Sequence, residues 1–265
     1  MEEINISLVQ STIFWEDTAK NLQHFDQLVS GIQEETDLIV LPEMFTTGFT
    51  MQPAKLAEEN GGSGLAWMKA KAQEKKCVIT GSICVNEDGK YYNRLFWVRP
   101  DGSYSQYDKR HLFRMARENE YYTQGSNLIT ESIKGWKIRP LICYDLRFPI
   151  WSRNRWTEEY NADYDVLLYV ANWPEVRNYP WKHLLIARAI ENQAYVVSVN
   201  RIGKDGNGID HSGDSACINP RGELISTIKS HVETIETIKI NPNYLIEFRK
   251  QFPVGNDADG FEIKS

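Results

Sequence analysis

The order of hydrophobic and polar residues predicts that strands and helices alternate at the start of the chain. Residues 4–10 alternate between apolar and polar side chains, which is typical of a strand with one buried face. The next apolar residues recur at helical spacing behind a possible capping residue, Asp17; they are Leu22, Phe25, Val29 and Ile32. The unbroken apolar run at 38–41 predicts a strand covered on both faces, and 63–76 reads as a second helix.

The pattern then changes to that of consecutive hairpins. Residues 77–85, 91–99 and 103–107 are strand-like. Asp88-Gly89 and Pro100-Asp101-Gly102 separate them and are signals for tight turns. We therefore expect these three strands to be antiparallel neighbours.

Alternation resumes in the second half, with strands expected at 138–142, 166–170 and 195–199 and a helix at 181–192. The sum predicts an α/β protein whose sheets contain both parallel and hairpin-paired strands, covered by helices. No stretch resembles a linker, so we expect residues 1–265 to form a single domain with a C-terminal tail from about residue 250.

Composition and charge narrow the classes of partner. The formal net charge of -6 argues against a nucleic-acid binder, which needs an excess of clustered Lys and Arg. The chain starts Met-Glu-Glu without the basic and apolar regions of a signal peptide, and no apolar run reaches membrane-spanning length. We expect a cytoplasmic protein that acts on small molecules, with no membrane partner.

Residues that could take part in catalysis follow four of the predicted strands. Polar stretches lie immediately beyond these strand ends, and they contain Glu43, Lys109, Cys143 and Asn172. In open α/β folds, ligand crevices form outside the carboxyl ends of strands, so residues far apart in sequence can converge there. Hydrolysis of an amide needs a nucleophile, a base and oxyanion donors, and Cys, Glu and Lys can supply all three.

The sequence around these residues resembles the catalytic motifs of a known family. The three stretches Leu41 to Phe45, Tyr107 to Phe113 and Leu141 to Pro149 are similar to the three catalytic motifs of the nitrilase superfamily. Later stretches resemble further landmarks of the family; they are 171–174, 187–193, 200–208 and 212–215. The resemblance implies a nitrilase-like four-layer α-β-β-α sandwich with two mixed sheets, commonly assembled as a homodimer.

The resemblance also implies roles for individual residues. Glu43 corresponds to the general base, Lys109 to the partner of the thiolate and the oxyanion, and Cys143 to the nucleophile. The backbone N–H of Tyr144 corresponds to a second oxyanion donor. The family places a second glutamate beside the site, for which Glu118 and the alternative Glu120 are the candidates.

Within the superfamily, residues 109–116 and the stretch that follows look most like the bacterial omega-amidases. Those enzymes remove the terminal amide of 2-oxo acids such as 2-oxoglutaramate and 2-oxosuccinamate. Such substrates are anions, so a cation should orient the far carboxylate. The candidate substrate-binding residues are Arg114, Arg147 and Arg177, with Trp173 as an apolar wall.

Several alternatives remain open. An N-carbamoyl amino acid amidohydrolase or a nitrilase would use the same three residues, and an inactive binding protein could share the fold. Cys143 with His111 could suggest a papain-like peptidase, but no signature of that family accompanies Cys143. The histidines lack zinc-ligand spacing and no Cys-x-x-Cys pair occurs, so we predict no metal and no cofactor. The other thiols, Cys77, Cys84 and Cys217, are expected to fill the core.

Overall fold

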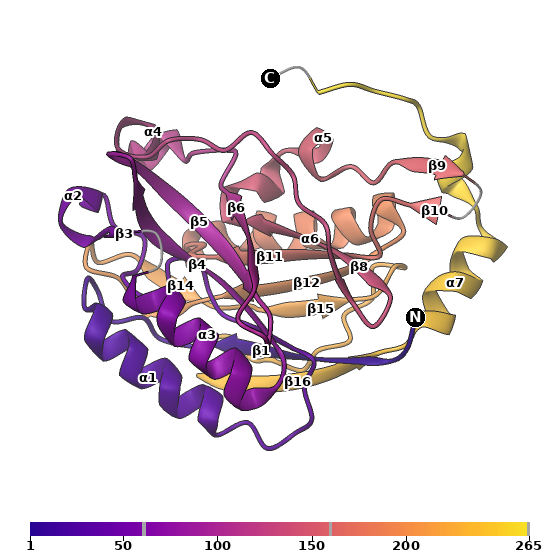
Figure 1. Ribbon diagram of the computed structural model, residues 1–265. Helices are drawn as coiled ribbons and strands as arrows, with labels where there is room; N and C mark the ends of the chain where they lie inside the picture. The colour runs from indigo at the N-terminus through magenta and orange to yellow at the C-terminus, as the bar shows by residue number, and fades with distance from the viewer. Residues whose placement is uncertain (60–61, 159–160, 264–265) are drawn as a thin grey trace.

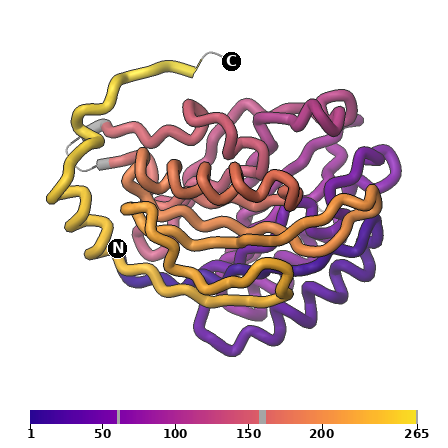
Figure 2. The backbone as a smooth tube through the Cα atoms, turned by 180° about the vertical axis from the view of Figure 1, so that it is seen from behind, coloured from indigo at the N-terminus to yellow at the C-terminus, as the bar shows by residue number. Residues whose placement is uncertain are grey.

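The computed structural model describes residues 1–59, 62–158 and 161–263, and in them two mixed sheets pack face to face between layers of helix. Helices α1 (Thr18–Ser30) and α3 (Ser63–Lys75) cover one sheet, while α6 (Asn178–Asn192) covers the other (Figures 1 and 2). The predicted four-layer α-β-β-α sandwich is confirmed. No helix in these described ranges is long and apolar enough to cross a bilayer.

The first sheet has seven strands in the order β16-β1-β2-β4-β5-β6, with β3 paired to β4. Their bounds are β1 (Ile4–Gln10), β2 (Leu38–Val40), β3 (Glu58–Glu59), β4 (Val78–Glu87), β5 (Lys90–Val98), β6 (Tyr104–Asp108) and β16 (Thr234–Ile240). β1, β2 and β4 run parallel, whereas β4, β5 and β6 are antiparallel neighbours, as the turn signals predict. β16 lies antiparallel to β1 at the other side.

The second sheet has five strands in the order β15-β12-β11-β8-β7. Their bounds are β7 (Glu131–Ile133), β8 (Trp136–Ile142), β11 (Val166–Ala171), β12 (Tyr195–Asn200) and β15 (Ala216–Ile218). β8, β11 and β12 are parallel, and the two edge strands are antiparallel to their neighbours. This sheet therefore presents the carboxyl ends of three strands at one edge.

Shorter elements lie outside the two large sheets. Two further pairs of strands are β9 (Trp156–Glu158) with β10 (Asn161–Ala162), and β13 (Ile202–Lys204) with β14 (Asp210–Ser212). The remaining helices are α2 (Pro53–Leu56), α4 (Glu118–Tyr121), α5 (Pro149–Ser152), α7 (Pro242–Gln251), η1 (Arg114–Ala116), η2 (Cys143–Arg147), η3 (Glu175–Arg177) and η4 (Val254–Asp257).

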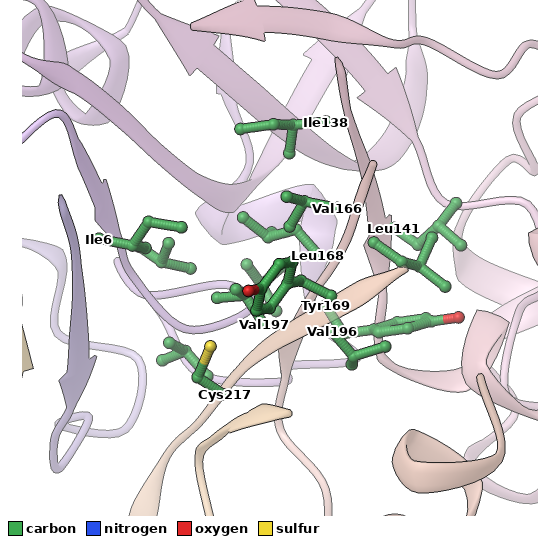
Figure 3. Close-up of a cluster of buried hydrophobic side chains, with 14 of the residues drawn as sticks. Ile6, Ile138, Leu141, Val166, Leu168, Tyr169, Val196, Val197 and Cys217 are labelled. Carbon is green, nitrogen blue, oxygen red and sulfur yellow. The ribbon is translucent and has the colours of Figure 1, made fainter. Parts of the chain in front are cut away.

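Two apolar clusters hold the layers together. One cluster, with Phe25 and Met68 among its members, packs α1 and α3 onto the first sheet. The other fills the space between the sheets and continues beneath α6 (Figure 3). Because successive side chains of a strand point to opposite faces, the buried Leu168 and Tyr169 of β11 pack on opposite faces of the second sheet. Both faces of the second sheet are thus buried, which explains its continuous apolar strands.

Candidate active site

Four candidate residues come together because each lies just beyond the carboxyl end of a strand. Glu43 lies three residues beyond β2, and Lys109 directly follows β6. In the facing sheet, Cys143 opens η2 at the end of β8, and Asn172 follows β11. β2 and β6 belong to one sheet and β8 and β11 to the other, so the site is built across the seam between the two sheets.

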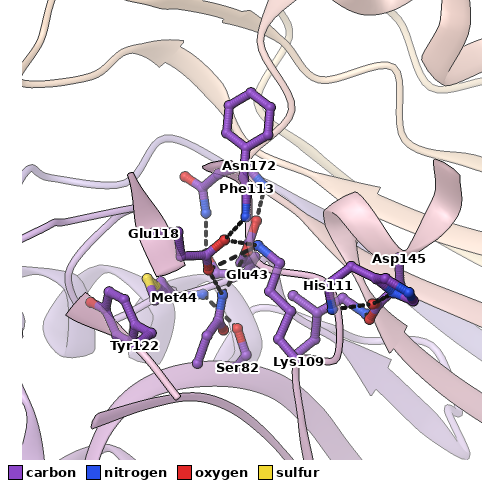
Figure 4. A network of polar contacts seen from close by, with 12 residues as sticks. Glu43, Met44, Ser82, Lys109, His111, Phe113, Glu118, Tyr122, Asp145 and Asn172 are labelled. Atoms are coloured by element: carbon purple, nitrogen blue, oxygen red, sulfur yellow. Dashed lines mark hydrogen bonds and ion pairs between the residues drawn. The ribbon is translucent and has the colours of Figure 1, made fainter. Parts of the chain in front are cut away.

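Glu43, Lys109 and Glu118 form an ion network that we call the ionic cluster (Figure 4). The Lys109 Nζ lies 2.9 Å from Glu43 Oε1 and 3.0 Å from both carboxylate oxygens of Glu118. All three side chains are buried. Charges removed from water are stable only when they are paired and hydrogen-bonded, and here each carboxylate shares the same ammonium.

The two candidates for the second glutamate occupy different environments. Glu118 points into the ionic cluster and also accepts a hydrogen bond of 2.6 Å from the backbone N–H of Phe113. Glu120 instead pairs with Arg117 at 2.6 Å on the surface, where both side chains are exposed. The geometry therefore favours Glu118 over the alternative Glu120.

Glu43 is held by further donors that were not assigned from the sequence. Its Oε1 accepts from Asn93 Nδ2 at 2.7 Å, and its Oε2 accepts from the backbone N–H of Asn172 at 2.7 Å. The Asn172 side chain also donates to the backbone carbonyl of Glu43. Asn172 carried a signal in the sequence, because it follows a strand end. Asn93 carried none, since it lies in the middle of β5.

Burial and the Glu43 carboxylate raise the pKa of the Cys143 thiol well above its ordinary value. Lys109 and the backbone N–H of Asn172 act in the opposite direction without overcoming them. The resting thiol is consequently protonated at neutral pH, and it needs a base to become a nucleophile. A hydrogen bond between Cys143 and Glu43 contributes to the raised pKa, which places a carboxylate in position to take that proton.

Burial and neighbouring charges also set the pKa values of Lys109 and Glu118. Burial alone would lower the pKa of Lys109, but the charges of Glu118 and Glu43 outweigh it and raise the pKa. Lys109 is therefore a fixed cation. Burial raises the pKa of Glu118 in spite of the opposing Lys109 charge. Because Glu43 and Glu118 share one ammonium, the cluster disfavours a further negative charge, such as that of a Cys143 thiolate.

The backbone around the nucleophile is constrained. Cys143 has a φ of 42° and Met44, next to Glu43, has a φ of 44°. Left-handed backbone costs a residue with a side chain roughly 1–2 kcal/mol, so the surrounding structure must hold these conformations in place. The backbone N–H of Met44 is held by Ser82 Oγ at 2.9 Å, and that of Ile142 by Asp145 Oδ2 at 3.0 Å.

His111 contacts Asp145 rather than the thiol. Its Nδ1 lies 2.8 Å from Asp145 Oδ1, its backbone N–H donates to the same oxygen, and its ring stacks on Phe148 at 3.7 Å. Asp145 also accepts from Tyr107 at 2.7 Å. This network ties the loop that carries Lys109 to the turn that carries Cys143.

A cavity of about 270 Å³ opens beside Cys143. Lys109, Tyr144 and Trp173 are among its walls, together with Arg147 and Arg177. Trp173 is buried and supports the Arg147 guanidinium, whose Cζ lies 4.9 Å from its ring. The predicted site residues of the second half thus surround one space.

The three candidate arginines differ in position. The Arg177 Cζ lies 5.3 Å from the ring of Phe113, and burial followed by the charge of Arg147 lowers the pKa of Arg177. Among the described residues, neither guanidinium of this arginine pair, Arg147 and Arg177, has a carboxylate partner. Arg114 is exposed on η1 and is not among the described residues that line the cavity.

The remaining thiols lie apart from this chemistry. Cys77, Cys84 and Cys217 are buried, and Cys217 packs in the apolar cluster between the sheets (Figure 3). Burial raises the pKa of the Cys77 and Cys84 thiols to about 12, so they stay protonated at neutral pH. Within the described ranges, no group of three or more His, Cys, Asp and Glu side chains could hold a metal ion.

The buried Glu-Lys-Glu cluster lies beside a cysteine, between the two sheets of a four-layer sandwich. This is the arrangement that the resemblance to the nitrilase superfamily implies. The model of the carbon-nitrogen hydrolase family matches residues 5–250, and this chain belongs to that family. The expected resemblance to the nitrilase superfamily is thereby confirmed.

Individual relatives are similar over nearly the whole chain. The chain is 46% identical to the omega-amidase YafV of Escherichia coli (strain K12), over 99% of this chain and 100% of that protein. It is 33% identical to the 2-oxoglutaramate amidase of Bacillus subtilis (strain 168), over 95% and 96%. The crystal structure of a CN-hydrolase superfamily protein from Xanthomonas campestris, with an arsenic adduct in its active site, matches with a TM-score of 0.97, 41% identity and full coverage of both chains.

Proposed function

We propose that this protein is an omega-amidase, which hydrolyses the terminal amide of 2-oxo dicarboxylic acid monoamides such as 2-oxoglutaramate and 2-oxosuccinamate. The similarity to the omega-amidase YafV and to a 2-oxoglutaramate amidase supports this reaction. The products are the free 2-oxo dicarboxylic acid and ammonia.

The observation that carries the substrate class is the arginine pair. Arg147 and Arg177 line the cavity that contains Cys143, and each lies against an aromatic ring, with no carboxylate partner in the part of the chain that the structure describes. Two adjacent guanidiniums repel each other until an anion binds between or beside them. A carboxylate followed by a 2-oxo group offers three acceptor oxygens to their planar donors, whereas the ammonium group of glutamine would add a third positive charge.

Acylation starts with transfer of the Cys143 proton to Glu43. The sulfur then attacks the amide carbon, and the oxyanion that forms accepts hydrogen bonds from Lys109 Nζ and the backbone N–H of Tyr144. The carbon–nitrogen bond breaks as Glu43 returns the proton to the nitrogen, so that ammonia leaves and the acyl group remains as a thioester on Cys143. Glu118 keeps Lys109 in place throughout these steps.

Deacylation reverses the proton movements with water as the nucleophile. Glu43 takes a proton from the water that attacks the thioester carbon, and the bond to sulfur breaks. The sulfur recovers its proton and the acid is released. The ionic cluster needs no rearrangement between acylation and deacylation, because the Glu43 carboxylate takes up and returns one proton in each.

The decisive experiment measures ammonia release from 2-oxoglutaramate, 2-oxosuccinamate, glutamine, an N-carbamoyl amino acid and an aliphatic nitrile. We expect turnover of both oxo-amides and much slower release from glutamine. Inactivity toward both oxo-amides would contradict the omega-amidase assignment. Turnover of the carbamoyl compound or the nitrile alone would move the protein to another branch of the family.

We also propose that the protein is a cytoplasmic homodimer that associates through the outer face of α6. Along this face Ile186 is partly buried and Ile190 is 52% exposed, and Leu224, 63% exposed, lies near them across Gly222. An apolar patch of this kind is typical of a protein interface. Sedimentation velocity should give a dimer for the wild-type protein and a monomer for Ile190→Glu, and a wild-type monomer would contradict the proposal.

A further inference from the structure

We propose that Asn93 is a positioning residue of the hydrolase, which holds the Glu43 carboxylate in the orientation in which one of its oxygens can accept the thiol proton. This inference rests on the proposed role of Glu43 as the base. Asn93 lies in the middle of β5, away from all three sequence motifs of the site, and its side chain is completely buried.

Asn93 contacts every member of the ionic cluster. Its Nδ2 donates to Glu43 Oε1 at 2.7 Å and reaches Glu118 Oε1 at 3.4 Å. Its backbone carbonyl accepts from the backbone N–H of Lys109 at 3.0 Å. One residue thus fixes the strand that delivers the lysine and supplies a neutral donor to both carboxylates.

The chemistry of the carboxylates determines which way the amide points. Ionised carboxylates only accept hydrogen bonds, so they require the NH₂ group of Asn93 and would repel its oxygen. The Oδ1 of Asn93 consequently faces away, and it has no hydrogen-bond partner among the described residues. A buried carbonyl without a partner costs free energy. The hydrogen bonds that Nδ2 donates to the two carboxylates offset the cost of leaving Oδ1 without a partner.

The contact orients the base. Among the described backbone, lysine and amide donors, Asn93 and Lys109 donate to Glu43 Oε1, and the Asn172 N–H donates to Oε2. Oε2 therefore keeps a lone pair for the thiol proton. Without Asn93, one of the hydrogen bonds that fix the carboxylate plane is lost, and Oε2 is less well aligned with the thiol.

The first test compares kcat and KM for ammonia release in the wild-type protein and in Asn93→Ala. Loss of a hydrogen bond to a charged group should lower kcat by about 10- to 100-fold, while KM changes by less than about two-fold because Asn93 does not line the described cavity wall. Asn93→Asp, which has nearly the same volume but supplies acceptors in place of the donors, should lower kcat further.

A matched control separates this role from a general effect on stability. Asn154 is equally buried and bonds to backbone groups away from the site, at Tyr164 and Asn192. Asn154→Ala should lower the melting temperature and leave kcat unchanged. An unchanged kcat in both Asn93 variants would overturn the proposal. Failure of both variants to fold would also overturn it, because Asn93 would then act on the fold alone.

A second readout needs no substrate. The rate at which iodoacetamide alkylates Cys143, followed by mass spectrometry of the Cys143 peptide, reports proton transfer to Glu43 directly. At pH 7 this rate should fall in Asn93→Ala by about the same factor as kcat. If the wild-type protein turns over neither oxo-amide, the omega-amidase proposal fails while this readout still decides the role of Asn93.

Discussion

Two groups of charged side chains meet at the cavity of Cys143, and they differ in how their charges are compensated. In the ionic cluster, Lys109 is shared by Glu43 and Glu118, and all three are buried. In the arginine pair, Arg147 and Arg177 lie against aromatic rings without a carboxylate partner among the described residues. In the ionic cluster every charge has a partner before any substrate arrives, whereas the arginine pair gains a partner when an anion binds.

The difference separates chemistry from recognition. A catalytic group gains from being fixed in advance, because no reorganisation is then needed during the reaction. A recognition group gains from being unpaired, because the binding of the correct anion relieves its repulsion. Changes to the first group should therefore affect stability and turnover together. Changes to the second should affect substrate binding alone.

The largest effect is expected from the thiol that both groups surround. Cys143→Ala should lower turnover by roughly 10⁴-fold or more, because no other group can form the thioester. The fold should remain intact, as shown by an unchanged circular dichroism spectrum and melting temperature within a few degrees. Cys217→Ala, a core thiol, serves as the control and should keep its activity. Normal ammonia release by Cys143→Ala would refute the mechanism.

Lys109→Met tests whether the ionic cluster is structural as well as catalytic. The variant leaves two buried carboxylates without their shared cation, which should cost about 3–5 kcal/mol of unfolding free energy and abolish turnover. Urea denaturation measures the loss. The same change at Lys239, whose ion pair with Glu3 is exposed on both sides, should cost less than about 1 kcal/mol. Equal losses in the two variants would mean that burial does not set the strength of the cluster.

Arg177→Met tests the unpaired group. Loss of a charge-assisted hydrogen bond should raise KM for the oxo-amides by about 10- to 100-fold. The unfolding free energy should not fall, because the charge of Arg147 already disfavours the Arg177 cation. Arg114→Met is the matched control, since Arg114 is exposed and away from the described cavity wall. A similar rise in KM in both variants would refute the assignment.

A further effect, on stability alone, concerns His211, a neutral residue of the cavity wall. Burial and then the charge of Arg201 lower the pKa of His211 to about 4 from its ordinary value of 6.5. Between these pH values only the unfolded chain binds the proton, so stability falls as pH falls, by up to about 3 kcal/mol. Urea denaturation at pH 7 and 4.5 should show a smaller acid loss for His211→Gln than for the wild-type protein. An equal loss would place the acid sensitivity elsewhere.

The local parts of the fold could be predicted from the sequence, and the long-range parts could not. The hairpin strands β4 to β6 were predictable because alternation and turn residues are both local signals. β16 was not predicted, because its register is set by β1, with Ile4 opposite Ile240 at the other end of the chain. α7 is likewise defined by what it packs on: Leu245 is buried in the cluster between the sheets.

The site residues likewise divide into those that a local motif identifies and those that only long-range contacts identify. Glu43, Lys109 and Cys143 were identified because each lies within a recognisable motif at a strand end. The choice between Glu118 and Glu120 depends on direction, since residues two apart on α4 cannot face the same partner. Asn93 was missed because a polar residue inside a strand carries no local sign of what lies opposite it.

The arrangement of the arginine pair beside an activatable thiol has a practical consequence for inhibitor chemistry. A short electrophile such as a chloroacetyl group, attached to a carboxylate two or three carbons away, would be held by the guanidiniums while its reactive carbon faces Cys143. Selectivity over other thiol enzymes would come from the anionic end. The ionic cluster would supply the base for the covalent step, so the reagent itself could be only weakly reactive in solution.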